Sequence, residues 1–306
     1  EQMSLFPVDP PKTLRGWIVY NGSLVTPKYT EQNELFMAAA QRLDIQLEPH
    51  TNDALGAAVL NGKLSLIPSL EAPDFVLFYD KDVRLARQLE LMGLRLFNSA
   101  ETIALCDDKI MTHIALANHG IPMPKTIFSP LLFPVCPVDE GPFIDKVEKT
   151  LSYPVVVKEA FGSFGAQVYL AQNRDELFAL RKKLIHKPHL YQKFVSSSHG
   201  RDVRLQVVGD EVVAAMMRTS ESDFRANVSA GGKMVPFIPS KAFSDLAVKA
   251  AKRVGAHFAG VDLLFGPSDE PILCEINSNA HIKNIMDCTG VDVADRILRY
   301  IKNKLV

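Results

Sequence analysis

Short apolar runs alternate with amphipathic segments along the first hundred residues of the chain. Residues 17–20 and 75–78 are apolar runs of strand length, whereas residues 30–43 and 83–92 carry apolar positions at helical spacing. Strands that alternate with helices are typical of a parallel α/β layer, so we predict a parallel sheet with helices over residues 14–100. No G-x-G-x-x-G motif follows the first strand, which argues against a dinucleotide site.

The rest of the chain mixes helices with half-buried strands. Residues 102–118 have helical spacing and stop before Gly120, and residues 129–142 form a proline-rich linker without a period. Residues 201–208 alternate between apolar and polar positions and turn at Gly209 into a second strand, which predicts an antiparallel hairpin. The remaining predicted elements are strands at residues 154–158 and 190–195 and helices at residues 175–185, 243–254 and 293–304.

A second predicted hairpin carries polar side chains inside two apolar runs near the C-terminus. Symmetric pairing about its turn places Asp262 opposite Glu275. Because side chains alternate along a strand, Asn277 should lie on the same side as Glu275, and Cys274 and Ile276 on the other side. Two facing carboxylates repel each other unless a cation lies between them, and oxygen ligands are what Mg²⁺ prefers. A solvated hairpin face is the alternative interpretation.

A lysine and a glycine-containing loop precede this hairpin. Lys158 ends an apolar run, and residues 159–166 connect it to the next one. Such a loop can close its backbone N–H groups over phosphates while the lysine supplies charge, although glycine hairpins and solvated lysines are common. Four arginines also precede the hairpin: Arg201, Arg204, Arg218 and Arg225. A surface charge is the default explanation for each of them alone. Together they indicate an anion neutralised by metal and arginine, as in phosphoryl transfer.

Composition limits the classes of partner. The 306 residues are 47% hydrophobic and 23% charged, and the formal net charge of -1 gives no general attraction to nucleic acid or anionic membranes. Scattered cysteines without C-x-x-C spacing predict reduced, mostly buried thiols and a cytoplasmic location. The sequence has no signal-peptide pattern, and no apolar run approaches the roughly 20 residues that span a bilayer, so we expect no membrane partner.

The order of the motifs resembles the ATP-grasp superfamily, and specifically the RimK-like glutamate ligases. GRDVR at residues 200–204, DFRAN at 223–227 and EINS at 275–278 carry the resemblance, which covers the chain from about residue 17. It implies an α/β and α+β fold, with a preATP-grasp parallel-sheet domain followed by a two-lobed ATP-grasp fold. The implied boundaries are residues 14–100 for the first domain and 101–306 for the second, with a small lobe at about 122–195 and a C-terminal lobe at about 196–306.

The resemblance also implies roles for individual residues. Arg225 and Asn227 correspond to catalytic residues that face the γ-phosphate and the substrate, and Asp202 corresponds to a ribose contact. Asp262, Glu275 and Asn277 correspond to the metal ligands. The other residues implied to bind the cofactor are Lys109 and Lys158 at the phosphates, Gly162, Ser163 and Gly165 in a lid loop, and Gln192, Lys193, Phe194 and Val195 at the adenine.

The implied activity is an ATP-dependent, ADP-forming ligation of a carboxylate to an amine through an acyl phosphate. The implied cofactors are ATP and Mg²⁺ or Mn²⁺, as two ions, and the added group is an amino acid such as glutamate on a small-molecule, peptide or protein acceptor. The resemblance allows a homo-oligomer. A kinase that phosphorylates a hydroxyl and a non-catalytic ATP-binding regulator are the alternatives.

The sequence departs from many relatives directly after EINS. Residues 279–284 stand where those relatives have a Ser-Pro-Gly-Leu turn, which leaves the identity of the added amino acid open. His281 and Lys283 either read a different carboxylate or act on the amine, or they are ordinary surface residues.

Overall fold

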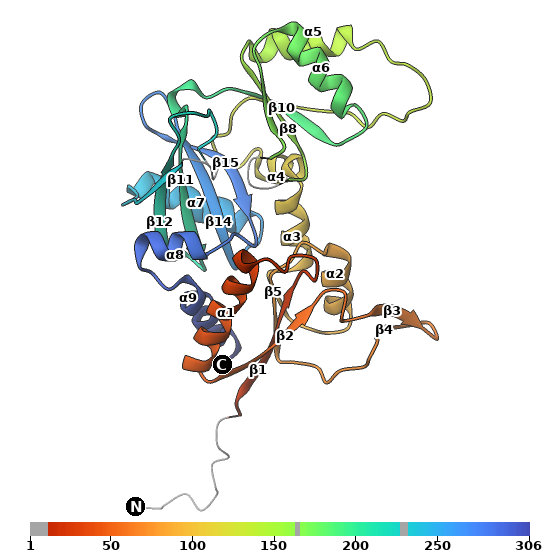
Figure 1. The fold of residues 1–306 in the computed structure, drawn as a ribbon, viewed down its shortest axis with the longest axis vertical. Helices are drawn as coiled ribbons and strands as arrows, with labels where there is room; N and C mark the ends of the chain where they lie inside the picture. The colour runs from red at the N-terminus through yellow and green to blue at the C-terminus, as the bar shows by residue number, and fades with distance from the viewer. Residues whose placement is uncertain (1–11, 163–165, 227–231) are drawn as a thin grey trace, which may run out of the picture. The chain divides into compact units, whose positions relative to one another are not determined.

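The computed structural model describes residues 12–162, 166–226 and 232–306 (Figure 1). The chain divides by its contacts into two compact units, one made of residues 1–97 with 294–306 and the other of residues 98–293. The last helix, α9 (Val293–Leu305), therefore groups with the first unit, whereas the sequence-based division assigned it to the C-terminal lobe. The division into preATP-grasp and ATP-grasp domains stays a prediction. Among the described residues, no helix is long and apolar enough to cross a membrane.

The first unit contains the predicted parallel sheet, in the order β2-β1-β5-β6. Helix α9 is anchored to it: the rings of Phe97 and Tyr300 lie 6.5 Å apart, and Lys302 Nζ donates to Leu43 O over 2.6 Å. The strands are β1 (Leu14–Tyr20), β2 (Ile45–Thr51), β5 (Phe75–Phe78) and β6 (Leu96–Phe97), with a separate hairpin of β3 (Ala57–Leu60) and β4 (Lys63–Leu66). The other helices of this unit are α1 (Pro27–Arg42) and α2 (Val83–Leu91).

The second unit contains a small antiparallel sheet in the order β7-β10-β8-β9. Two helices pack on it, and their apolar side chains share a core with Val155, Val157 and Tyr191. Asn173 caps one of these helices by accepting from the backbone N–H of Glu176, which explains where that helix begins. The elements are β7 (Thr126–Phe128), α5 (Gly141–Leu151), β8 (Val155–Glu159), β9 (Val168–Ala171), α6 (Arg174–Leu184) and β10 (His189–Lys193).

A larger antiparallel sheet completes the second unit, in the order β13-β12-β11-β14-β15. Its strands are β11 (Arg201–Val208), β12 (Glu211–Thr219), β13 (Lys233–Pro236), β14 (Phe258–Phe265) and β15 (Pro271–Asn277). The remaining helices are α3 (Ala100–Asp107), α4 (Lys109–Leu116), η1 (Ser196–Ser198), α7 (Lys241–Arg253) and α8 (Lys283–Thr289).

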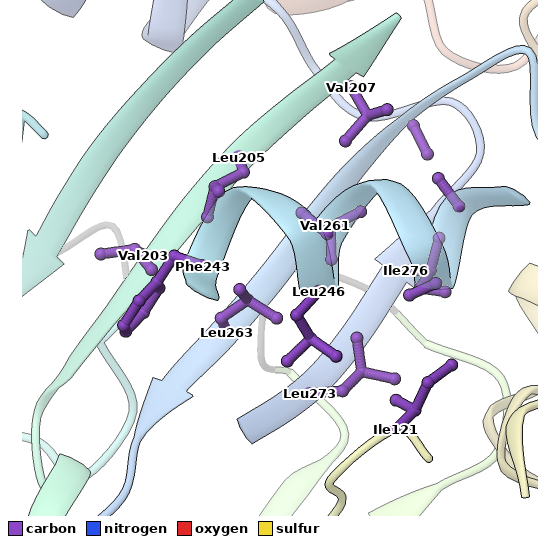
Figure 2. Packing of buried hydrophobic residues seen from close by; sticks show 14 of the residues in the cluster. Ile121, Val203, Leu205, Val207, Phe243, Leu246, Val261, Leu263, Leu273 and Ile276 are labelled. Carbon is purple, nitrogen blue, oxygen red and sulfur yellow. The ribbon is translucent and has the colours of Figure 1, made fainter. Parts of the chain in front are cut away.

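One face of the larger sheet forms the core under α7. Figure 2 shows Phe243 and Leu246 of this helix among side chains from β11, β14 and β15, including Val203, Leu205 and Val261. Each fully buried side chain of this kind contributes about 1.5–3 kcal/mol to folding. Because side chains alternate along a strand, the residues between these core positions project from the opposite face of the sheet.

The single helix predicted over residues 102–118 is wrong, because the structure breaks it at Asp108. This residue has an extended backbone with φ -94° and ψ 106°. Its carboxylate accepts from the backbone N–H groups of Ile110 and Met111, which caps a new helix. The break makes Lys109 the first residue of α4 and sets the direction of its side chain.

Candidate active site

One cavity in the second unit collects most of the residues that the sequence singled out. Its walls come from β8 and β10 of the small sheet and from β11, β14 and β15 of the larger sheet. Asn277 is not among its lining residues, and Ser163, Gly165 and Asn227 lie outside the described residues. The predicted residues that line it are Lys109, Lys158, Gly162, Gln192, Lys193, Phe194, Val195, Asp202, Arg225, Asp262 and Glu275.

Apolar side chains from both sheets also line the cavity, and the sequence analysis missed them. Val156 lies two residues before Lys158, and Leu264 lies two residues after Asp262. The alternation of side chains along a strand therefore could have identified both, because each shares a face with a predicted site residue. Apolar walls from two sheets suit a flat ring such as a nucleotide base.

The acidic hairpin pairs as predicted at its centre. Asp262 of β14 lies opposite Glu275 of β15, and Gly260 lies opposite Asn277. Ile276 points into the core under α7, as expected. Two carboxylates therefore meet on neighbouring strands at the cavity.

The predicted direction of Cys274 is wrong. The pairing shifts after Asp262, so that Leu263 lies opposite Leu273 and Cys274 is an extra residue in β15. This β-bulge interrupts the alternation, and Cys274 lines the cavity together with Glu275. Burial raises the pKa of the Cys274 thiol to about 11, which keeps it protonated near neutral pH and makes it a poor nucleophile.

The two predicted phosphate lysines approach the hairpin from different elements. Lys109 Nζ donates to the backbone carbonyl of Gly162 over 3.0 Å and lies 3.7 Å from Glu275 Oε1. Lys158 Nζ, from β8, lies 3.8 Å from Cys274 Sγ. Lysines at these positions can stabilise an anion that enters the cavity.

A buried network of two carboxylates and two guanidinium groups lies on the cavity-facing side of the larger sheet. Arg204 pairs with Asp262 through Nε–Oδ1 (2.7 Å) and Nη2–Oδ2 (2.9 Å). Arg218 pairs with Asp202 through Nε–Oδ1 (2.8 Å) and Nη2–Oδ2 (2.6 Å). The same Nη2 atom lies 3.1 Å from Asp262 Oδ2, so Arg218 joins both pairs.

The network separates the acidities of its two carboxylates. Burial raises the pKa of Asp202, although the adjacent Arg218 acts in the opposite direction. Burial also disfavours the charge of Asp262, but Arg204 and Arg218 outweigh that effect and lower its pKa. Asp262 is therefore the more firmly ionised member, as a metal ligand needs to be.

The expectation that the arginines wait for an anion is only partly met, because each of the four already has a carboxylate partner. Arg201 pairs with Asp269 over 2.9 Å, outside the network. Arg225 donates to both carboxylate oxygens of Asp223, from Nε (3.0 Å) and from Nη2 (2.9 Å), and this hydrogen bonding lowers the pKa of Asp223. The sequence could not reveal these pairs, because the partners are joined by strand register and loop geometry.

Gln192 uses its side chain within the protein. Its amide nitrogen lies 3.0 Å from His113 Nε2 and 3.1 Å from Thr126 Oγ1. His113 Nδ1 lies 2.6 Å from Lys109 O, and burial lowers the pKa of His113, which favours a neutral ring that donates from Nδ1 and accepts at Nε2. Gln192 thus links α4 to the small sheet. Because its side-chain nitrogen is already engaged within the protein, a nucleotide base would have to contact other atoms of the cavity wall.

The hairpin residues fit a hard cation in part. Asp262 and Glu275 supply carboxylate oxygens at the cavity, which suits Mg²⁺. Asn277 Oδ1 accepts from the backbone N–H of Asn279 over 3.1 Å, so its role as a third ligand stays a prediction. Within the described ranges, no cluster of three His, Cys, Asp or Glu side chains is arranged to hold a metal.

The departing segment after the hairpin, residues 279–284, contributes no lining residue to the cavity. Neither His281 nor Lys283 is among the lining residues. Lys283 Nζ pairs with Asp287 Oδ2 over 2.7 Å at the start of α8. The arrangement favours a local structural role for Lys283.

Solved structures share this architecture. The RimK domain ATP-grasp protein from Sphaerobacter thermophilus matches 94% of this chain with 99% of its own, at a TM-score of 0.69 and 19% sequence identity. This likeness identifies the ATP-grasp fold.

Sequence comparison identifies the family. A family model described as the RimK-like ATP-grasp domain matches residues 106–301, which is more than half of the chain. Human N-acetylaspartylglutamate synthase A is 32% identical over 291 residues, covering 90% of this chain and 73% of that protein. A probable alpha-L-glutamate ligase from Stenotrophomonas maltophilia is 37% identical over 221 residues, covering 71% of this chain and 72% of that protein. The chain belongs to the RimK-like ATP-grasp family and is an ATP-dependent ligase that forms carbon–nitrogen bonds.

Proposed function

We propose that the protein joins the carboxylate of one substrate to the amine of another through an acyl phosphate, with ADP and phosphate as the other products. The observation that carries this proposal is the cavity in which Lys109 and Lys158 approach the Asp262–Glu275 pair. Cationic side chains opposite paired carboxylates suit a polyphosphate bound together with a divalent cation.

Each part of the cavity has a proposed task. Lys109 and Lys158 hold the phosphates of ATP, and Val156 and Leu264 pack against its base. Asp262 and Glu275 hold Mg²⁺, with Asn277 as a proposed third ligand. The ion would neutralise the charge that develops on the transferred phosphoryl group.

The reaction itself needs no covalent bond to the protein. The substrate carboxylate attacks the γ-phosphorus, the bond to ADP breaks, and an acyl phosphate forms. The amine then attacks the acyl carbon, loses a proton and expels phosphate. Arg225, with Asn227, is the proposed group that stabilises the transferred phosphoryl group and the tetrahedral intermediate.

The relatives support an amino acid as one substrate. One is named as an N-acetylaspartylglutamate synthase and another as a probable alpha-L-glutamate ligase. We therefore propose glutamate as the first amino acid to test, on a small-molecule, peptide or protein acceptor. Because residues 279–284 depart from the Ser-Pro-Gly-Leu turn of many relatives, the amino-acid pools of the assay include alternatives to glutamate.

Release of phosphate and ADP from Mg-ATP tests the proposal. The purified chain is incubated with pools of amino acids and short peptides, and product masses are read alongside. Free phosphate with a product equal to two substrates less one water supports the ligase. ADP with a product heavier by one phosphoryl group would instead identify a kinase, and bound Mg-ATP without turnover in every pool would favour a regulator.

A further inference from the structure

The carboxylate proposed to hold the metal is already held by arginine. Asp262 is only 2% exposed. Its Oδ1 accepts from Arg204 Nε over 2.7 Å, and its Oδ2 lies 2.9 Å from Arg204 Nη2 and 3.1 Å from Arg218 Nη2. One guanidinium donor at Oδ1 and two at Oδ2 stabilise the ionised carboxylate and occupy most of the lone-pair directions from which a cation would approach.

The charges around the hairpin sum in favour of an anion. Asp202 and Asp262 are matched by Arg204 and Arg218, and Glu275 lies 3.7 Å from Lys109 Nζ. Lys158 Nζ contacts the hairpin at Cys274 Sγ (3.8 Å) and has no carboxylate partner among the described residues, so its positive charge remains in excess. A free divalent cation is repelled by this arrangement, whereas a polyphosphate is attracted to it.

We propose that Arg204 and Arg218 are positioning residues that withhold Asp262 from the metal until a nucleotide polyphosphate draws their guanidinium groups away. The cation then enters with the nucleotide or after it. This inference rests on the proposed function, because it takes the Asp262–Glu275 pair as the metal site. The step exchanges ionic partners and breaks no covalent bond.

Arg218 couples the two ends of the network. Its Nη2 atom is shared between Asp202 Oδ2 (2.6 Å) and Asp262 Oδ2 (3.1 Å). A nucleotide that binds at Asp202 while its phosphates attract the guanidinium groups therefore disturbs both carboxylate contacts together. Metal affinity is expected to depend on the whole nucleotide and to respond less to inorganic phosphate.

Mn²⁺ binding without turnover tests the proposal. Loss of the free Mn²⁺ signal in electron paramagnetic resonance is followed on the full chain, first alone and then with ADP. We expect no saturable binding to the wild-type chain below about 1 mM without nucleotide, and clear binding once ADP is present. In Arg204→Met, binding without nucleotide should tighten by about tenfold or more, because Asp262 loses the guanidinium group that donates to both of its oxygens.

Arg201→Met is the matched control, because Arg201 also lines the cavity but pairs with Asp269. It should leave the nucleotide-free chain without Mn²⁺ binding. Arg204→Lys retains a charge but not the two-point contact, so it should behave between wild type and Arg204→Met even if the latter unfolds easily.

Tight Mn²⁺ binding by the nucleotide-free wild-type chain would overturn the inference, as would identical nucleotide-free affinities in wild type, Arg204→Met and Arg204→Lys. Failure of the wild-type chain to bind ADP at all would contradict the proposed function instead. The nucleotide-free titrations would still decide whether the arginines close Asp262 to cations, so the two failures are distinguishable.

Discussion

Two buried arginine clusters in the second unit look alike in chemistry and differ in surroundings. In the small sheet, Arg181 is 1% exposed, and its guanidinium binds Glu140 Oε2 over 2.5 Å and lies over the ring of Phe143 at 4.0 Å. His189 and Tyr191 complete this cluster, with 2.6 Å between His189 Nε2 and the tyrosine hydroxyl. In the larger sheet, Arg204 and Arg218 hold Asp262 and Asp202 at the cavity wall.

The difference shows that a buried charge does not by itself mark a catalytic site. None of the small-sheet cluster lines the cavity, so its contacts join α5, α6 and β10 structurally, with Glu140 directly before α5. The cavity network has the same kinds of groups, but its two carboxylates face the space where a ligand would bind. We therefore expect changes in the first cluster to affect folding and changes around the second to affect binding and turnover.

The largest effect is expected at Glu275, which stands beside the cavity network. Glu275→Ala should reduce Mg-ATP turnover by about a hundredfold or more, because one proposed metal ligand is lost. The thermal unfolding curve should stay close to wild type, since Glu275 is half-buried and its ion pair with Lys109 is long at 3.7 Å. Glu270→Ala, in the turn of the same hairpin, is the control; an undiminished rate in Glu275→Ala would refute the metal assignment.

Arg181→Leu tests the structural side of the comparison. The change leaves Glu140 without its guanidinium partner and removes the packing on Phe143. The free energy of unfolding, measured in urea, should therefore fall by about 3 kcal/mol. The affinity for Mg-ADP should stay within about twofold of wild type, because Arg181 does not line the cavity. Arg174→Leu, at an exposed ion pair on the same helix, should change little. A large loss of nucleotide affinity in Arg181→Leu would remove the distinction between the two clusters.

A smaller effect on binding is expected at Asp202. Asp202→Asn keeps the size of the side chain but loses the charge that holds Arg218, and it replaces one of the two oxygens that could accept from a ribose hydroxyl by a donor NH2 group. Calorimetry should show about tenfold weaker binding of Mg-ADP, while binding of inorganic phosphate should change less. Equal weakening for ADP and phosphate would argue against a ribose contact.

The smallest effect is the pH dependence of the small-sheet cluster. Burial lowers the pKa of His189 from its ordinary 6.5. Below pH 6.5 the histidine of the unfolded chain binds a proton, whereas the buried ring of the folded chain stays neutral down to its lower pKa. The stability that the neutral ring contributes is therefore present above pH 6.5 and is lost as pH falls from 6.5 toward the folded-state pKa. His189→Gln should therefore lose less stability than wild type between about pH 8 and about pH 5.5 in urea unfolding. An unchanged pH dependence would show that His189 does not titrate as its burial implies.

Local sequence patterns predicted much of the fold and part of the site. The parallel sheet of the first unit followed from alternating apolar runs and helical spacing, and the opposition of Asp262 and Glu275 followed from simple strand pairing. The bulge at Cys274 could not be predicted, because alternation assumes a regular strand. The arginine partners were also out of reach, because Arg204 meets Asp262 only through the register of β11 with β14.

The order in which the chain is synthesised gives the position of α9 a further consequence. Residues up to 97 are synthesised before residues 98–293, yet the unit that they form also includes residues 294–306. Tyr300 supplies a ring contact to Phe97, and Lys302 a hydrogen bond to the carbonyl of Leu43. The second unit lies between these segments in the chain and can complete its own contacts before them. The first unit therefore receives its last segment only after all residues of the second unit have been synthesised.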